Sequence, residues 1–188
     1  IVSYFTYNNI KENMYSDYEE KVGFSVQSGD KIINNVENIA VQLSNEPYII
    51  NAGIIQNADN NIDYERNKNI LRILKNFGSY NDDVKNIYLY EAKNNTVYSS
   101  KEDFYNINEF SQKDIILKNT LFAGSIKLED KGFSNVYLNS INGKVYMYIN
   151  FLYSIDKPLS TIIIEINTDN LFREYKKETN DLCAVYNS

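Results

Sequence analysis

Few of the side chains that usually carry out catalysis occur in this sequence. Its 188 residues include no histidine and one cysteine, Cys183. Histidine-assisted nucleophiles, imidazole metal sites, intramolecular disulfides and cysteine-cluster zinc sites are therefore excluded. A net charge of −6 disfavours nucleic acid as a partner, because a polyanion is repelled on average.

Two segments have the Ser-x-x-Lys spacing in which a lysine can activate a serine nucleophile, Ser28–Lys31 and Ser154–Lys157. The other two motifs of the penicillin-binding enzymes are missing, and Ser28–Lys31 lies within a predicted helix. The acidic pairs Asp82-Asp83 and Glu129-Asp130 are typical of solvated turns. A hydrolase is therefore the weakest of the functions considered, and we predict that this chain is not an enzyme.

A stretch beginning at Asp59 resembles the start of an EF-hand calcium loop. Its sixth position is Tyr64 instead of glycine, and its twelfth is Ile70 instead of glutamate. The sharp turn and the bidentate carboxylate that calcium requires are both missing. We therefore predict no metal site and no cofactor.

The side chains best suited to binding are tyrosines that alternate with aliphatic residues. In NGKVYMYINFLYSIDKP, residues 142–158, Tyr146, Tyr148 and Asn150 have one parity, and Val145, Met147, Ile149 and Phe151 have the other. The same alternation recurs in three shorter stretches, 86–91, 96–100 and 135–140. Because successive strand residues point to opposite faces, the pattern predicts a sheet with an aliphatic face and a tyrosine face.

Helical periodicity precedes this sheet. Apolar residues recur at steps of three and four from Ile10 to Leu43, which predicts a long helix ending at Asn45. Its apolar stripe is expected to cover the aliphatic face. A short second helix is predicted to begin at Pro47, with Ser44 or Asn45 as its cap.

A third helix is predicted over residues 63–77, with Gly78 in the left-handed conformation that ends it. The sheet follows, and the Asn142-Gly143 dipeptide is its strongest hairpin signal. A last strand, 159–166, leads into a closing helix, 168–178. The irregular segment 101–133, with a short helix expected around 111–119, is the long polypeptide available to cover the tyrosine face.

The organisation predicted is a helical region over 1–83, a sheet with its closing helix over 84–178, and a short piece, 179–188. The last piece is either a following segment or the first strand of a second module. The apolar residues IVSYF at 1–5 are either the outer end of a transmembrane helix or an ordinary N-terminus. No run of about 18 apolar residues is present in the sequence.

This order of elements resembles the Cache domain, a PAS-like extracellular sensor domain of bacterial histidine kinases and chemoreceptors. Three segments carry the resemblance: SNEPYIINAG (44–53), KNIYLYEAKNNTVYSS (85–100) and STIIIEINTDNLFREY (160–175). It implies an α+β fold, with a long N-terminal helix packed on a five-stranded antiparallel sheet. It also implies a ligand pocket on the other face of the sheet, roofed by 101–133.

Tyrosine offers a flat apolar body and a hydroxyl, which suits a small-molecule pocket. The alternative is a tyrosine face that is solvated or merely packed. The predicted ligand-binding residues are Tyr98, Tyr105, Tyr146, Tyr148, Asn150, Tyr153 and Asp156. Amino-acid-binding double-Cache receptors carry an arginine and a tryptophan in the insertion. Residues 101–133 contain neither, so a ligand α-carboxylate lacks its usual partner here.

We expect an extracellular sensing domain of a membrane-anchored bacterial receptor, a histidine kinase more than a chemoreceptor. Its partner is an unidentified small molecule or binding protein, and a homodimer is expected through long-helix positions such as Met14, Tyr18 and Val22. The alternative is a protein-interaction module of the same fold that binds no small ligand.

Overall fold

The computed structural model of this chain describes the backbone of residues 2–51, 60–114, 116, 126–127, 136–154 and 157–171. Side chains are described at 15, 16, 19, 20, 22–24, 26–51, 64–114, 116, 136–150 and 159–170. The helices are α1 (Val2–Ser44), α2 (Pro47–Ile50), α3 (Asn60–Ser79) and α5 (Thr168–Leu171). The strands are β1 (Val84–Glu91), β2 (Thr96–Ser99), β3 (Phe104–Asn106), β4 (Ile126–Lys127), β5 (Val136–Ile141), β6 (Lys144–Ser154) and β7 (Lys157–Ile166).

The chain divides into two compact units, and the division falls within α1. One unit comprises residues 1–34 together with 169–188, and the other comprises Asn35–Thr168. The second, called here the sheet unit, holds the last turns of α1, then α2, α3 and every strand named above. The predicted long helix is confirmed, and it begins at Val2.

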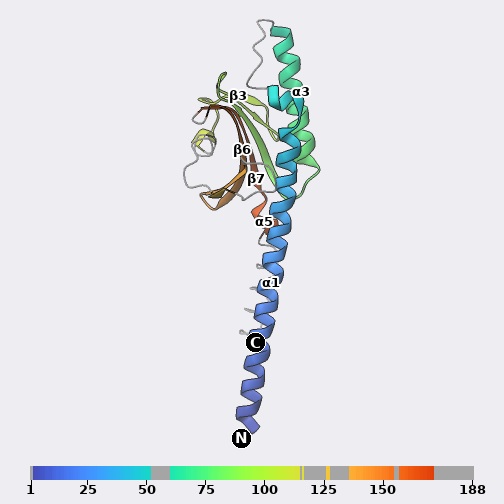
Figure 1. The fold of residues 1–188 in the computed structure, drawn as a ribbon, viewed down its shortest axis with the longest axis vertical. Helices are drawn as coiled ribbons and strands as arrows, with labels where there is room; N and C mark the ends of the chain where they lie inside the picture. The colour runs from blue at the N-terminus through green and yellow to red at the C-terminus, as the bar shows by residue number, and fades with distance from the viewer. Residues whose placement is uncertain are drawn as a thin grey trace. The chain divides into compact units, whose positions relative to one another are not determined.

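The sheet is antiparallel, with the strand order β3-β2-β1-β7-β6-β5-β4 (Figure 1). The five central strands are the five predicted from the sequence, and the α+β fold class is confirmed. The expected strand number was too low, because β3 and β4 extend the two edges of the sheet. Both come from the segment 101–133 and have only three and two residues, which is too short to show an alternating pattern.

The hairpin between β5 and β6 has the predicted turn. Ile141 pairs with Lys144, and the two residues between them have positive φ, 54° at Asn142 and 75° at Gly143. Asparagine and glycine tolerate this backbone conformation better than other residues, and its twist matches that of the flanking strands. The turn therefore fixes the register of the longest hairpin.

Two predicted helix boundaries were wrong. Glu46, and neither Ser44 nor Asn45, is the N-cap of α2, and it makes no side-chain capping hydrogen bond; Pro47 does occupy the first turn. The side chains of Ser44 and Asn45 instead donate to the carbonyl oxygen of Val41, at 2.7 and 3.0 Å. They satisfy the end of α1, which leaves the prearranged φ of Pro47 to start α2.

Gly78 does not end α3 in a left-handed conformation, because it lies within the helix. A Cβ atom at this position would come within 2.9 Å of Ser100 Oγ and 3.2 Å of Ser100 Cβ. Glycine is therefore needed for the close approach of α3 to the sheet, where the helix packs on β1 and β2 (Figure 1).

The two ends of the sheet unit are bonded to the same turn. Asn35 Nδ2 donates to Asp83 Oδ2 at 2.7 Å, and the Asn167 N–H donates to the Asp83 carbonyl at 2.8 Å. Asn167 Nδ2 also donates to the Asp82 carbonyl at 2.9 Å, while Asn81 Oδ1 accepts the Asp83 N–H at 3.0 Å. The turn before β1 therefore ties α1 to the residue that follows β7.

Candidate ligand-binding face

Strand register divides the sheet into two faces of different chemistry. Tyr137 pairs with Tyr148, which pairs with Ile163, which pairs with Tyr88. Directly paired residues share a face, so this row belongs to one side of the sheet. We call this side the tyrosine face, and its described members are Asn86, Tyr88, Tyr90, Val97, Ser99, Tyr105, Tyr137, Asn139, Ile141, Lys144, Tyr146, Tyr148, Asn150, Thr161, Ile163 and Glu165.

Part of the tyrosine face is covered by the segment after β3, as predicted. Ile107, Phe110 and Ile116 belong to the same buried cluster as the sheet tyrosines. The ring of Phe110 meets that of Tyr88 edge to face, with centroids 5.9 Å apart, and Gln112 Oε1 accepts the Tyr88 hydroxyl at 2.8 Å. These contacts fix the cover over the β1 side of the face.

Two polar atoms over the β6 side have no hydrogen-bond partner among the described residues. They are the Tyr146 hydroxyl and Asn150 Nδ2, on side chains with exposed fractions of 0% and 2%. Asn150 Oδ1, by contrast, accepts the Thr161 hydroxyl at 2.6 Å. Leaving a buried donor unsatisfied costs about 1–3 kcal/mol, so such atoms call for an explanation.

The two unpartnered donors lie on either side of Tyr148 along β6. Tyr146 and Asn150 are four residues apart on one strand, which places them about 13 Å apart on the same face. Tyr148 lies between them with no exposed surface, and its ring stacks on that of Tyr137 at a centroid distance of 5.2 Å. Two donors therefore flank an aromatic platform.

A buried carboxylate sets the electrostatics of the face. Glu165 has an exposed fraction of 3% and pairs across the strands with Tyr146. Its Oε1 lies 3.0 Å from Lys144 Nζ, and its Oε2 lies 3.4 Å from the Tyr88 hydroxyl. Burial, and then the Glu165 charge, raises the pKa of Tyr146 to about 12 and also raises that of Tyr88. Both hydroxyls therefore stay protonated, and able to donate, at neutral pH.

The structure brings together four of the seven predicted ligand-binding residues. Tyr105, Tyr146, Tyr148 and Asn150 lie on the tyrosine face. For Tyr153 only the backbone, within β6, is described, and Asp156 lies outside the described residues.

Tyr98 was assigned to the wrong face. It pairs with Leu89, because the connection of residues 92–95 places Thr96 opposite Glu91. Val97 consequently pairs with Tyr90 on the tyrosine face. The alternation predicted within β2 was correct. The length of the connection, however, decides which residues of β2 lie on the same face as the tyrosines of β1.

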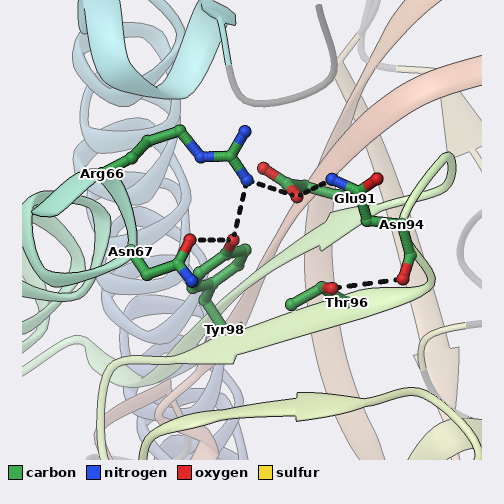
Figure 2. Close-up of polar contacts among 6 residues, drawn as sticks. All are labelled: Arg66, Asn67, Glu91, Asn94, Thr96 and Tyr98. Atoms are coloured by element: carbon green, nitrogen blue, oxygen red, sulfur yellow. Dashed lines mark hydrogen bonds and ion pairs between the residues drawn. The ribbon is translucent and has the colours of Figure 1, made fainter. Parts of the chain in front are cut away.

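On its actual face Tyr98 joins a buried polar cluster under α3 (Figure 2). Its hydroxyl donates to Asn67 Oδ1 at 2.9 Å and lies 3.5 Å from Arg66 Nη2. The same Arg66 nitrogen forms an ion pair with Glu91 Oε2 at 3.2 Å, and Asn94 Nδ2 donates to that oxygen at 3.2 Å. Burial, and then the Glu91 charge, raises the pKa of Tyr98.

Sequence reasoning missed this cluster although it contained a signal. Glu91 has the same parity as Ile87 and Leu89 in β1, so it belongs to the aliphatic face. A carboxylate on the same strand face as buried aliphatic residues is itself buried and therefore requires a cationic partner. Arg66 and Arg72, two of the three arginines in the sequence, lie in α3, and Arg66 supplies that partner.

Two kinds of feature are absent from the described part of the chain. Its aspartate and glutamate side chains form no group able to hold a metal ion. None of its helices combines the length and the apolar character that spanning a membrane requires.

No protein-family model and no curated protein matches this sequence. Among solved structures the chain is similar to the ligand-binding domain of the Campylobacter jejuni chemoreceptor Tlp3 in complex with L-valine. The identity is 14% and the TM-score 0.54, over 90% of this chain and 66% of that one. For the sensory domain of the same receptor the identity is 13% and the TM-score 0.53, over 90% of this chain and 67% of that one. For the ligand-binding domain in complex with L-norvaline the identity is 13% and the TM-score 0.52, over 82% of this chain and 59% of that one.

This chain therefore spans about two thirds of the length of the sensory domains that it matches. An identity of 13–14% establishes a shared fold. Together with the strand order and the long helix, the comparison shows that the chain shares the fold of these receptor domains, in agreement with the α+β fold that its resemblance to Cache domains implies.

Proposed function

We propose that this chain is the extracellular sensing domain of a bacterial membrane receptor and binds a small molecule non-covalently on the tyrosine face. The observation that carries the proposal is the pair of buried donors, Tyr146 O–H and Asn150 Nδ2, without partners among the described residues. A ligand that accepts hydrogen bonds from both would offset their desolvation. The fold shared with chemoreceptor sensory domains gives independent support.

The chemistry of the face favours a ligand with neutral acceptor oxygens, such as carbonyl or hydroxyl groups. Both unpartnered groups are donors, and the cation among the described residues of this face, Lys144, is already paired with Glu165 at 3.0 Å. The strands contain no arginine to pair with a carboxylate. The Tlp3 structures contain L-valine and L-norvaline; this face favours a different polar group.

Binding would act by population shift: a ligand that prefers one of two arrangements of sheet and helix favours that arrangement, which α1 transmits. A histidine kinase is our first choice for the parent receptor and a chemoreceptor the second. Homodimerisation through α1 is supported by large apolar side chains that are exposed on this helix. They are Tyr15, Val22, Phe24 and Val26, with exposed fractions of 43–61%.

A thermal-shift screen against amides, sugars, amino acids and carboxylates, followed by Tyr146→Phe, tests the proposal. A ligand at 100 times its dissociation constant adds about 2.7 kcal/mol to the free energy of unfolding. Tyr146→Phe removes one oxygen atom, so the free protein should keep or gain stability. Affinity for the ligand should fall about 3- to 10-fold, the value of one hydrogen bond.

Tyr80→Phe is the matched control, because it removes the same atom from a side chain that is 89% exposed. It should change neither the stability nor the affinity. A ligand whose affinity is unaffected by Tyr146→Phe would contradict the proposed site.

The second candidate is a protein-interaction module of the same fold. It is favoured by Ile107, Phe110 and Ile116, which already pack against the tyrosine cluster and fill part of the face. No hit in the screen, together with lower stability of Tyr146→Phe, would support this reading, since the hydroxyl would then have a partner within the protein.

A further inference from the structure

A concave surface lies between α3 and the start of β3, on the side of the sheet that α3 covers. Its volume is about 510 Å³, and its lining includes Tyr64, Lys68, Arg72, Lys75, Asp103 and Phe104. We call it the α3 groove. It takes no part in the function proposed above, because Arg66 and Asn67 place α3 over the face opposite the tyrosines.

The groove follows one stripe of the helix. Tyr64, Lys68, Arg72 and Lys75 are spaced by four, four and three residues, so they recur on one side of α3. The stripe extends over about 17 Å at 1.5 Å per residue. An open groove of this length suits an extended segment of about five residues, at 3.3 Å each, better than a compact metabolite.

The groove concentrates positive charge on a protein whose net charge is −6. Within the described part of the chain, no carboxylate lies within ion-pairing distance of Lys68, Arg72 or Lys75. The acidic side chain in the lining is Asp103, whose Oδ1 accepts the backbone N–H of Phe104 at 3.0 Å. The three cations are thus available to an external anion.

Aromatic side chains supply the apolar part of the surface. Tyr64 has an exposed fraction of 62% and Phe104 one of 40%, although large hydrophobic side chains are usually buried. Exposed tyrosine beside arginine is the composition that dominates the binding energy of protein interfaces. The groove therefore offers both anchoring rings and charge.

We propose that the α3 groove docks an extended acidic segment of a partner protein. Carboxylates of the segment pair with Lys68, Arg72 and Lys75, and an intervening apolar side chain packs between Tyr64 and Phe104. Positive charge aligned along the stripe selects acidic over basic segments and raises the association rate at low salt. Because the groove and the tyrosine face lie on opposite sides of the sheet, both can be occupied together.

Fluorescence anisotropy with two labelled eight-residue peptides, alternating Leu-Glu and alternating Leu-Lys, tests this proposal. The acidic peptide should bind, more weakly as sodium chloride is added, and the basic peptide should not bind. Lys68→Glu/Arg72→Glu/Lys75→Glu should weaken binding at least tenfold. Lys68→Gln/Arg72→Gln/Lys75→Gln should also weaken it, by removing charge without creating repulsion.

The matched control is Lys85→Glu/Lys93→Glu/Lys113→Glu, which makes the same change in net charge at exposed lysines outside the groove. It should retain binding, and circular dichroism should show all variants folded. Equal losses in the groove and control variants would overturn the proposal, as would failure to discriminate the two peptides. Displacement of the peptide by sodium acetate at an equal carboxylate concentration would instead indicate a site for small anions and also overturn it.

Discussion

Arg66 and Glu91 form an ion pair that is almost entirely removed from water. The exposed fraction of the Glu91 side chain is 0% and that of Arg66 is 11%. Taking both charges out of water offsets much of their attraction, so the pair adds little net stability compared with apolar residues of similar size. We infer that the pair mainly selects this placement of α3 on the sheet over other placements, since burying one charge without the other is unfavourable.

Arg66→Met should lower the free energy of unfolding by about 3–5 kcal/mol, because it leaves the Glu91 charge buried without its partner. The double variant Arg66→Met/Glu91→Leu should recover most of this loss. Urea denaturation followed by circular dichroism measures both. A double variant no more stable than Arg66→Met would show that the loss does not come from the buried charge of Glu91.

Gly78 has a comparable effect on the packing of a whole helix. Ser100 Oγ, the atom that a Cβ at Gly78 would meet, is held in place on both sides. It donates to Asn86 Oδ1 at 2.7 Å and accepts the Ile87 N–H at 3.0 Å. The serine cannot move aside without losing these bonds, so α3 would have to shift.

Gly78→Ala should therefore destabilise the protein by about 1–2 kcal/mol, even though alanine is the better helix former. Gly23→Ala, in α1, is the control, because a Cβ there would meet nothing within 4 Å. It should not destabilise the protein and should slightly increase its helix content. Thermal unfolding of both variants checks the opposite signs; equal effects would contradict the close packing of α3.

Which elements form could be predicted from local pattern, but how they meet could not. The apolar steps of α1 and the Asn142-Gly143 turn need only neighbouring residues, and both predictions are confirmed. A glycine near a helix end, such as Gly78, is naturally interpreted as a helix cap. Only its contact with Ser100 shows that it is needed for close packing. The face of Tyr98 depended on pairing across 92–95, which alternation within a strand does not determine. The burial of Glu91 could have been predicted, since its position in the alternation of β1 already placed a charge among buried residues.

The buried tyrosines couple the stability of the sheet unit to alkaline pH. Burial raises the pKa of Tyr88, Tyr90, Tyr98 and Tyr146 above the ordinary value of 10.0. Above pH 10 the unfolded chain loses these protons while the folded chain keeps them. The folded state then binds more protons, so its stability is complete below pH 10 and falls as the pH rises.

The free energy of unfolding should therefore decline from about pH 10, and the part due to Tyr146 should level off near its folded pKa of about 12. Each hydroxyl ionised only in the unfolded chain contributes about 1.4 kcal/mol per pH unit. Tyr146→Phe should reduce the slope, as measured by urea denaturation at stepwise pH. An unchanged slope would mean that the Tyr146 hydroxyl ionises alike in both states.

The bonds that Asp83 makes to Asn35 and Asn167 give the sheet unit the properties of a cassette. Its first residue and its penultimate residue are joined through one side chain and one carbonyl of the same amino acid. A domain whose ends emerge together can be inserted between two segments of another protein without forcing them apart. Residues 35–168 could thus be exchanged as a block between proteins of this fold, while the helices on either side keep their own sequence.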